Sequence, residues 1–75
     1  MSPISCLNAI KNRYPSLTAV EKRVADYIQH NRERICSMSV SEFSHKADVT
    51  KSAIVRCCKS LGFAGYTELK MSLAI

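Results

Sequence analysis

The sequence has few of the residues that turns require, with two glycines and two prolines in 75 residues. Gly and Pro supply the backbone conformations of tight turns, and a β-rich domain needs many such turns. Their scarcity therefore favours a helical fold. A chain of this length forms at most one domain with a thin hydrophobic core, which argues against an enzyme with a deep, water-excluding pocket.

Targeting signals and membrane spans are also missing from the sequence. Residues 1–10 lack the basic start and the long apolar run of a signal peptide. No apolar stretch approaches the roughly 20 residues that a membrane-spanning helix needs. We therefore expect a cytoplasmic protein with no membrane partner.

The four cysteines show no spacing that predicts chemistry. Cys6, Cys36, Cys57 and Cys58 form no C-x-x-C pair, and neither histidine lies at a metal-ligand spacing from them. We expect reduced, mostly buried thiols, with no metal and no cofactor. The Ser, Thr, Cys and His residues also offer no set of nucleophile, base and orienting group, so we expect no enzyme activity.

Positive charge is in excess. Eleven Lys and Arg against six Asp and Glu give a formal net charge of +5 and a sequence pI of about 9.3. A small basic domain favours a nucleic-acid partner or an anionic membrane surface. Charge alone does not choose between them.

The first half of the chain predicts two helices and a short helical turn. The first helix runs from about Pro3 to Asn12, with Ser2 as its cap. Thr18 and Glu21 form a capping-box pattern that opens the second helix, which ends near Asn31. Its predicted apolar stripe consists of Val20, Val24, Tyr27 and Ile28. A short helical turn follows over Arg32 to Cys36, with Asn31 as a candidate cap and Ile35 as its apolar anchor.

The second half predicts three more helices. Ser39 and Glu42 repeat the capping-box pattern, and Asp48 with Val49 interrupts the helix that they open. The next helix begins at Thr50 and runs to Leu61, where Gly62 follows as a left-handed C-cap. The last begins near Tyr66 and shows no stop signal, so we expect the natural chain to continue beyond Ile75. The predicted fold is all-α, a compact bundle of about five helices.

The segment from Ser39 to Gly62 carries the pattern of a helix-turn-helix. Ser44 is small where the two helices must cross, and Asp48 stands where a left-handed turn residue is often needed. Branched or apolar residues occupy the turn and the inner faces. They are Val40, Phe43, Ala47, Val49, Ile54, Cys57 and Leu61.

At 100° per residue, the helix from Thr50 to Leu61 separates into two faces. The inward face gathers Ala53, Ile54, Cys57, Cys58 and Leu61. The outward face gathers Ser52, Val55, Arg56 and Lys59, with Lys51 and Ser60 on its flanks, and carries three cations and no acid. In helix-turn-helix proteins the second helix enters the major groove of double-stranded DNA.

The outward residues divide by chemistry into base-reading and phosphate candidates. Arg binds guanine bidentately, Ser serves several bases, and Val contacts a thymine methyl, so Ser52, Val55 and Arg56 are the base-reading candidates. The phosphate candidates are Lys46, Lys51 and Lys59. Thr50 is expected to lie near the base edges or the nearest phosphates. The predicted site thus comprises Thr50, Lys51, Ser52, Val55, Arg56, Lys59 and Lys46.

Other interpretations stay open at this point. A basic outer face is usually a solvated helix face, and helical hairpins also serve as protein-interaction modules. Arg56 could pair with Glu68 or cap a helix end instead of reading a base. Phe63 and Tyr66 are expected to be core anchors rather than base-stacking residues, because no sheet platform or aromatic series accompanies them. His45 is expected to be solvated.

Two stretches of the sequence resemble a known family. Residues 39–70 read SVSEFSHKADVTKSAIVRCCKSLGFAGYTELK, and residues 17–28 read LTAVEKRVADYI. The most specific parts are VTxxxIVR over 49–56 and LGFxGYxELK over 61–70. Together they resemble the N-terminal domain of the RpiR family of bacterial transcription regulators, and the match extends from about Leu7 to Leu73.

The resemblance implies an all-helical DNA-binding domain. In that family the domain is normally followed by a sugar isomerase-like domain that senses phosphorylated sugars. Members usually act as homodimers or higher oligomers on palindromic operators near genes of sugar-phosphate metabolism. Two positions depart from the pattern, with Cys57 in place of the usual Phe and Ala53 in place of a commoner Thr. The smaller Cys57 requires another group, such as Phe63 or Tyr66, to fill the core.

Overall fold

The computed structural model describes residues 6–73, and every regular element in this part of the chain is a helix. In order these are α1 (Cys6–Arg13), a 3-10 turn η1 (Tyr14–Ser16), α2 (Ala19–His30), α3 (Arg32–Ile35), α4 (Val40–Ala47), α5 (Lys51–Ser60) and α6 (Tyr66–Leu73). The predicted all-α fold class is confirmed. None of these helices has the length and hydrophobicity required to cross a bilayer.

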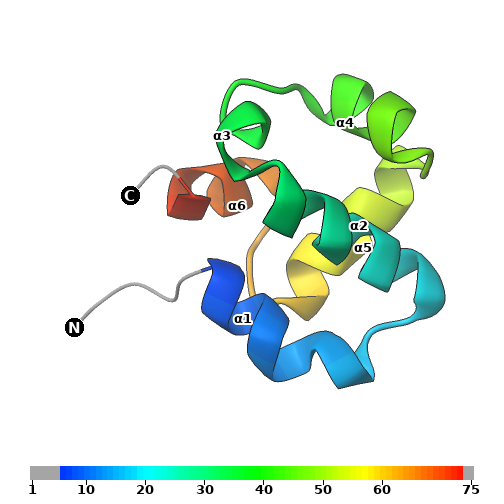
Figure 1. The fold of residues 1–75 in the computed structure, drawn as a ribbon, viewed down its shortest axis with the longest axis vertical. Helices are drawn as coiled ribbons and strands as arrows, with labels where there is room; N and C mark the ends of the chain where they lie inside the picture. Colours follow the sequence, from blue (N-terminus) through cyan, green and yellow to red (C-terminus); the bar gives the residue numbers. More distant parts are fainter. Residues whose placement is uncertain (1–5, 74–75) are drawn as a thin grey trace.

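The helices wrap around one core in which α2 and α5 are the central pair. α5 packs mainly on α2, and also on α4 and α6, while α6 reaches back to α1 and α3. The start of α1 and the end of α6 lie side by side (Figure 1), where the backbone N–H of Cys6 donates to Ser72 Oγ at 2.9 Å. The chain therefore closes on itself at the edge opposite the turn between α4 and α5.

Local capping signals set the boundaries of the longer central helices. Thr18 accepts from the Glu21 N–H and the Glu21 carboxylate accepts from the Thr18 N–H, so the predicted capping box is complete. At the start of α4 only half of the predicted capping box forms: the Ser39 hydroxyl accepts from the Glu42 N–H, and no reciprocal bond to the Glu42 carboxylate accompanies it. Gly62 has φ of 98°, the left-handed conformation expected after α5.

Two expectations for the first half were wrong, and a third lies outside the described residues. Val20 is 49% exposed, because the buried face of α2 is centred on Val24, Ala25 and Ile28 and the Val20 side chain borders an open groove beside α5. Asn31 does not cap α3; its Nδ2 donates to the carbonyl of Tyr27 and so closes α2. The predicted start of the first helix at Pro3 and its cap Ser2 lie outside the described part of the chain.

Three buried cysteines contribute to the core as small apolar residues. Cys6, Cys57 and Cys58 are buried, and burial raises the pKa of the Cys6 thiol to about 11 and of the other two to about 12. Cys36 is exposed, and all four are free thiols. The sulfur of Cys57 lies 3.5 Å from the carbonyl oxygen of Glu21, so the backbone of α2 approaches α5 closely at this small side chain.

An aromatic cluster joins α2, α4 and α6. Phe43 is fully buried between Tyr27, at 5.1 Å between ring centroids, and Tyr66, at 5.7 Å with an edge-to-face arrangement. The hydroxyl of Tyr66 donates to the carbonyls of Met38 at 2.8 Å and Ile35 at 3.4 Å. Burial raises the pKa of Tyr66 to about 12. Tyr66 is therefore a core anchor, as expected, and it fastens α6 to the segment between α3 and α4.

We expect Tyr66→Phe to lower the free energy of unfolding by about 1 kcal/mol, because it removes a buried hydrogen-bond donor while keeping the ring. For a domain of this size that corresponds to a fall of about 4–8 °C in the melting temperature, measured by circular dichroism. Tyr27→Phe is the matched control, since its hydroxyl has no hydrogen-bond partner among the described residues. Equal losses in the two variants would contradict this role of Tyr66.

Candidate nucleic-acid interface

The turn between α4 and α5 is built from three residues with distinct tasks. Asp48 adopts the left-handed conformation, with φ of 58° and ψ of 48°, as its position in the sequence predicted. The backbone N–H groups of Asp48 and Val49 both donate to the carbonyl of Ser44, which closes α4. Thr50 then caps α5 by accepting from the Ala53 N–H at 3.0 Å. This tight turn makes α4 and α5 a helix-turn-helix.

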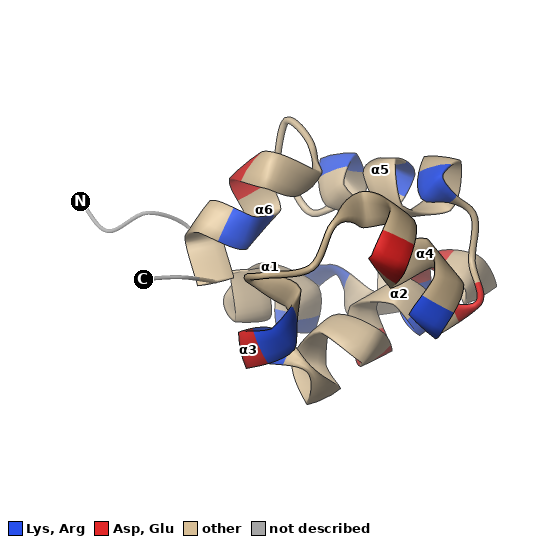
Figure 2. Ribbon diagram, turned by 90° about the horizontal axis from the view of Figure 1, so that it is seen from above, with Lys and Arg blue, Asp and Glu red and all other residues tan. Residues whose placement is uncertain are grey.

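The two faces of α5 are those that the helical spacing predicted. Every residue of the predicted inward face is buried, including Leu61 just past the end of the helix. Lys51, Ser52, Arg56 and Lys59 are exposed, and Val55 is half-buried between the faces. Figure 2 shows α5 along one edge of the molecule with Lys and Arg positions distributed along its length. The outer face of α5 is therefore an accessible, acid-free, basic surface.

The remaining predicted site residues lie at the start of this surface and beside it. Thr50 is exposed at the N-terminus of α5, where its hydroxyl serves as the cap. Lys46 is exposed in the last turn of α4, two residues before Asp48. Six of the seven predicted residues thus lie on α5 or its cap, and Lys46 lies on the helix that precedes the turn.

Arg56 neither pairs with Glu68 nor caps a helix end. The described residues give it no hydrogen bond or ion pair, and the Glu68 carboxylate instead accepts from the N–H of Ala64 at 3.3 Å. The Arg56 charge does help to lower the pKa of Glu21. Its guanidinium is therefore available at the surface of α5.

Hydrogen bonds that sequence spacing did not reveal hold Ser60, at the C-terminal end of α5, and we call this group of contacts the clasp. The Glu21 carboxylate accepts from the Thr18 N–H at 2.9 Å and from the Ser60 hydroxyl at 2.7 Å. These hydrogen bonds to the ionised form, led by the backbone bond from Thr18, hold the pKa of Glu21 below its ordinary value. Arg13 donates to the carbonyl of Ser60 at 2.9 Å, so α1 and α2 both hold the last residue of α5.

A surface groove of about 650 Å³ runs between the first turns of α2 and the side of α5. Its walls include the exposed Val20 from α2 and Ala53 and Arg56 from α5. Arg23 and Asp48 stand at its rim, with 3.9 Å between Nη1 and Oδ2 in an exposed ion pair. The small side chain of Ala53 contributes to the open space. The groove adjoins the basic face of α5.

We expect the contact between Ser60 and Glu21 to appear as non-additivity in a double-mutant cycle. Ser60→Ala alone should cost about 1 kcal/mol of unfolding free energy, because it removes a hydrogen bond to a carboxylate at a partly exposed site. In a Glu21→Ala background the same change should cost less. Urea denaturation measures both.

Ser37→Ala is the control for this cycle, because its hydroxyl bonds locally to the Arg34 carbonyl, away from Glu21. It should add to Glu21→Ala without coupling. Strict additivity of Ser60→Ala and Glu21→Ala would show that the hydrogen bond between Ser60 and Glu21 contributes nothing to stability.

Comparison with known proteins places the sequence among transcription regulators. Residues 4–75 match the protein-family model described as the helix-turn-helix domain of the rpiR family. An HTH-type transcriptional regulator of Haemophilus influenzae is 38% identical over 69 residues, which cover 92% of this chain and 24% of that protein. The regulator HexR of Pseudomonas aeruginosa is 34% identical over 68 residues, covering 91% of this chain and 24% of HexR.

A solved structure supports the same relationship. The N-terminal domain of the putative transcriptional regulator YbbH from Bacillus subtilis superposes with a TM-score of 0.86 at 35% sequence identity. The alignment covers 92% of this chain and 84% of that one. The chain spans about a quarter of the length of the curated relatives it matches.

Proposed function

The chain belongs to the rpiR family of helix-turn-helix domains, and on this premise we propose that it reads a specific sequence in double-stranded DNA. The family supports a role in transcription regulation, and the task we propose for this chain is binding rather than catalysis. In the proposed complex α5 lies in the major groove, with its N-terminal half nearest the bases.

The observation that carries this proposal is the outer face of α5. It presents Lys51, Arg56 and Lys59 without an acid, and these side chains form no ion pair among the described residues. The buried inner face of α5, its N-cap Thr50 and the left-handed Gly62 after it hold this surface in one orientation, which base reading requires.

Each residue of the predicted site has a proposed part. Ser52, Val55 and Arg56 face the base edges, where the Arg56 guanidinium matches the two acceptors of guanine. Lys51 and Lys59 bind phosphates beside the helix, and Lys46 binds one next to α4. Thr50 accepts from the Ala53 N–H and so sets the start of the helix, and its O–H donor remains for a base edge or the nearest phosphate.

The wider setting of the proposal rests on the family resemblance. It implies a cytoplasmic homodimer on a palindromic operator of sugar-phosphate genes, with a C-terminal sugar isomerase-like domain that binds the phosphosugar effector. The curated relatives, about four times as long as the stretch matched here, leave room for such a domain.

Selection from a randomised duplex library tests the proposal. The folded chain should enrich one half-site, and binding followed by fluorescence anisotropy should weaken steeply as salt rises, because phosphate contacts release counterions. The measurement is made at two salt concentrations. If folded protein binds no duplex at low salt, a protein-interaction module becomes the better interpretation.

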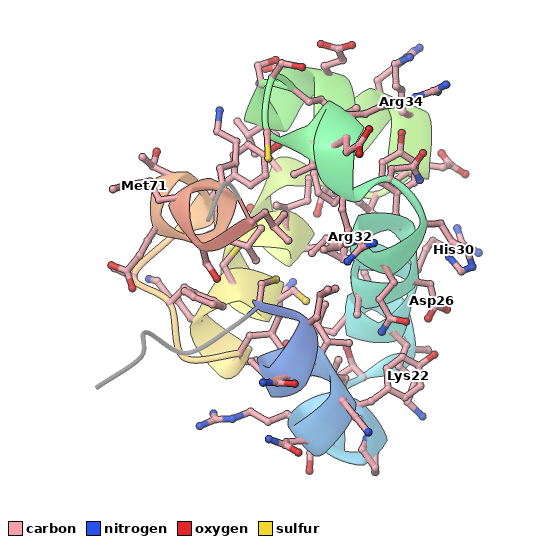
Figure 3. The ribbon with its side chains drawn as sticks, turned by 60° about the vertical axis from the view of Figure 1, so that its left-hand side comes forward. Lys22, Asp26, His30, Arg32, Arg34 and Met71 are labelled. Atoms are coloured by element: carbon pink, nitrogen blue, oxygen red, sulfur yellow. The ribbon has the colours of Figure 1, made fainter. Side chains whose placement is uncertain are left out.

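We expect Arg56→Ala to weaken binding to the selected site by about 1–3 kcal/mol and to relax the preference at one base pair. The thermal melt should hardly change, since Arg56 is exposed and unpaired among the described residues. Arg34→Ala on α3 is the control. Figure 3 shows Arg34 pointing away from the helices, and α3 lies on the opposite side of the molecule from α5 in Figure 2. An equal loss for all DNA sequences would assign Arg56 to a phosphate instead.

A further inference from the structure

Two arginines from outside the helix-turn-helix lie at opposite ends of α5. Arg23 of α2 reaches the rim of the groove at the start of α5, where it meets Asp48. Arg13 of α1 reaches the end of α5, where it donates to the carbonyl of Ser60. We call this surface, comprising Arg13, Arg23 and the groove wall at Val20, the α2 flank.

Both arginines keep most of their donors available for another acceptor. A guanidinium has five N–H donors, and the Ser60 carbonyl takes only one from Arg13. The partner of Arg23 is weak, because the two charged groups are 3.9 Å apart and the side chains are 62% and 96% exposed. An anion that approaches the flank can therefore bind either residue without breaking a buried contact.

The two acids beside the α2 flank differ in whether they can compete with a phosphate for Arg23. The Glu21 carboxylate already accepts from Thr18 and Ser60, so both of its oxygens are hydrogen-bonded and it forms no ion pair with Arg23 among the described residues. Asp48 is almost fully exposed and has only the long contact with Arg23. Among the residues that line the groove, Asp48 is thus the acid that competes directly with a phosphate for Arg23.

When a recognition helix lies in the major groove, the sugar–phosphate strands pass along its two sides. We propose that the α2 flank binds the backbone of one strand, with Arg13 and Arg23 as phosphate ligands. The exposure of Val20 fits this arrangement, because its methyl groups lie in the groove, where they contact the apolar face of a deoxyribose. This inference rests on the proposed DNA-binding function and extends the interface to α1 and α2.

The test compares the salt dependence of binding for the wild-type chain and its variants on one selected duplex. Each phosphate contact contributes about 0.9 to the slope of log K against log salt. Arg23→Ala should reduce the magnitude of that slope by about 1, weakening binding by a similar factor for all sequences. Arg13→Ala should do the same, and the double variant should reduce it by about 2.

Asp48→Asn provides the opposite change. Asn tolerates the left-handed conformation, so the turn is kept while the competing charge is removed. Binding should become several-fold tighter at low salt. Arg34→Ala, on the far side of the molecule, should leave affinity and slope unchanged. Thermal melts check that the variants remain folded, which matters most for Arg13 because it also holds Ser60.

The outcomes separate this inference from the proposed function. Wild-type binding to duplex DNA, combined with an unchanged slope in Arg23→Ala and no gain in Asp48→Asn, would overturn the α2 flank alone. Failure of the wild-type chain to bind any duplex would overturn both. If Arg13→Ala unfolds, Arg23→Ala and Asp48→Asn still decide the matter, because neither side chain makes a buried contact.

Discussion

The packing of α5 on α2 is the constraint on which the rest of the structure depends. A recognition helix reads bases only if its axis is fixed relative to the rest of the domain. In a domain this small the hydrophobic core is thin, so few contacts are available to fix that axis. Here the backbone of α2 comes close to Cys57, and the Glu21 carboxylate binds Ser60 one turn further along. Glu21 is also part of the capping box, so one residue both starts α2 and holds the end of α5.

The local elements of this fold could be predicted from the sequence because each has a local cause. Thr18, Ser39 and Thr50 accept from an N–H three residues ahead, and Asp48 and Gly62 take left-handed positions. The inward face of α5 follows from helical geometry alone. Helical spacing therefore suffices to place the outward residues between Thr50 and Lys59 on one surface.

The remainder depends on contacts between residues far apart in the chain. Ser60 meets Glu21 across 39 positions and Arg13 across 47, and no spacing rule connects such pairs. Val20 was misplaced for the same reason, because helical periodicity does not show where the packing of two helices leaves an open groove. Asn31 was misjudged because its amide had two helix ends within reach and bonded to the earlier one. The α2 flank is built entirely from such long-range placements.

The residues that stabilise the position of α5 differ from the residues that form its outer face, so the fold and the outer face can change independently. The side chains that hold α5 in place lie on its inner face and at Ser60, whereas Lys51, Ser52, Arg56 and Lys59 make no contact that the fold requires. Exposed positions of this kind are replaced at a cost within about 0.5 kcal/mol. Under the proposed function, a lineage can change the DNA sequence that α5 prefers, one outward residue at a time, while it keeps the same stable scaffold.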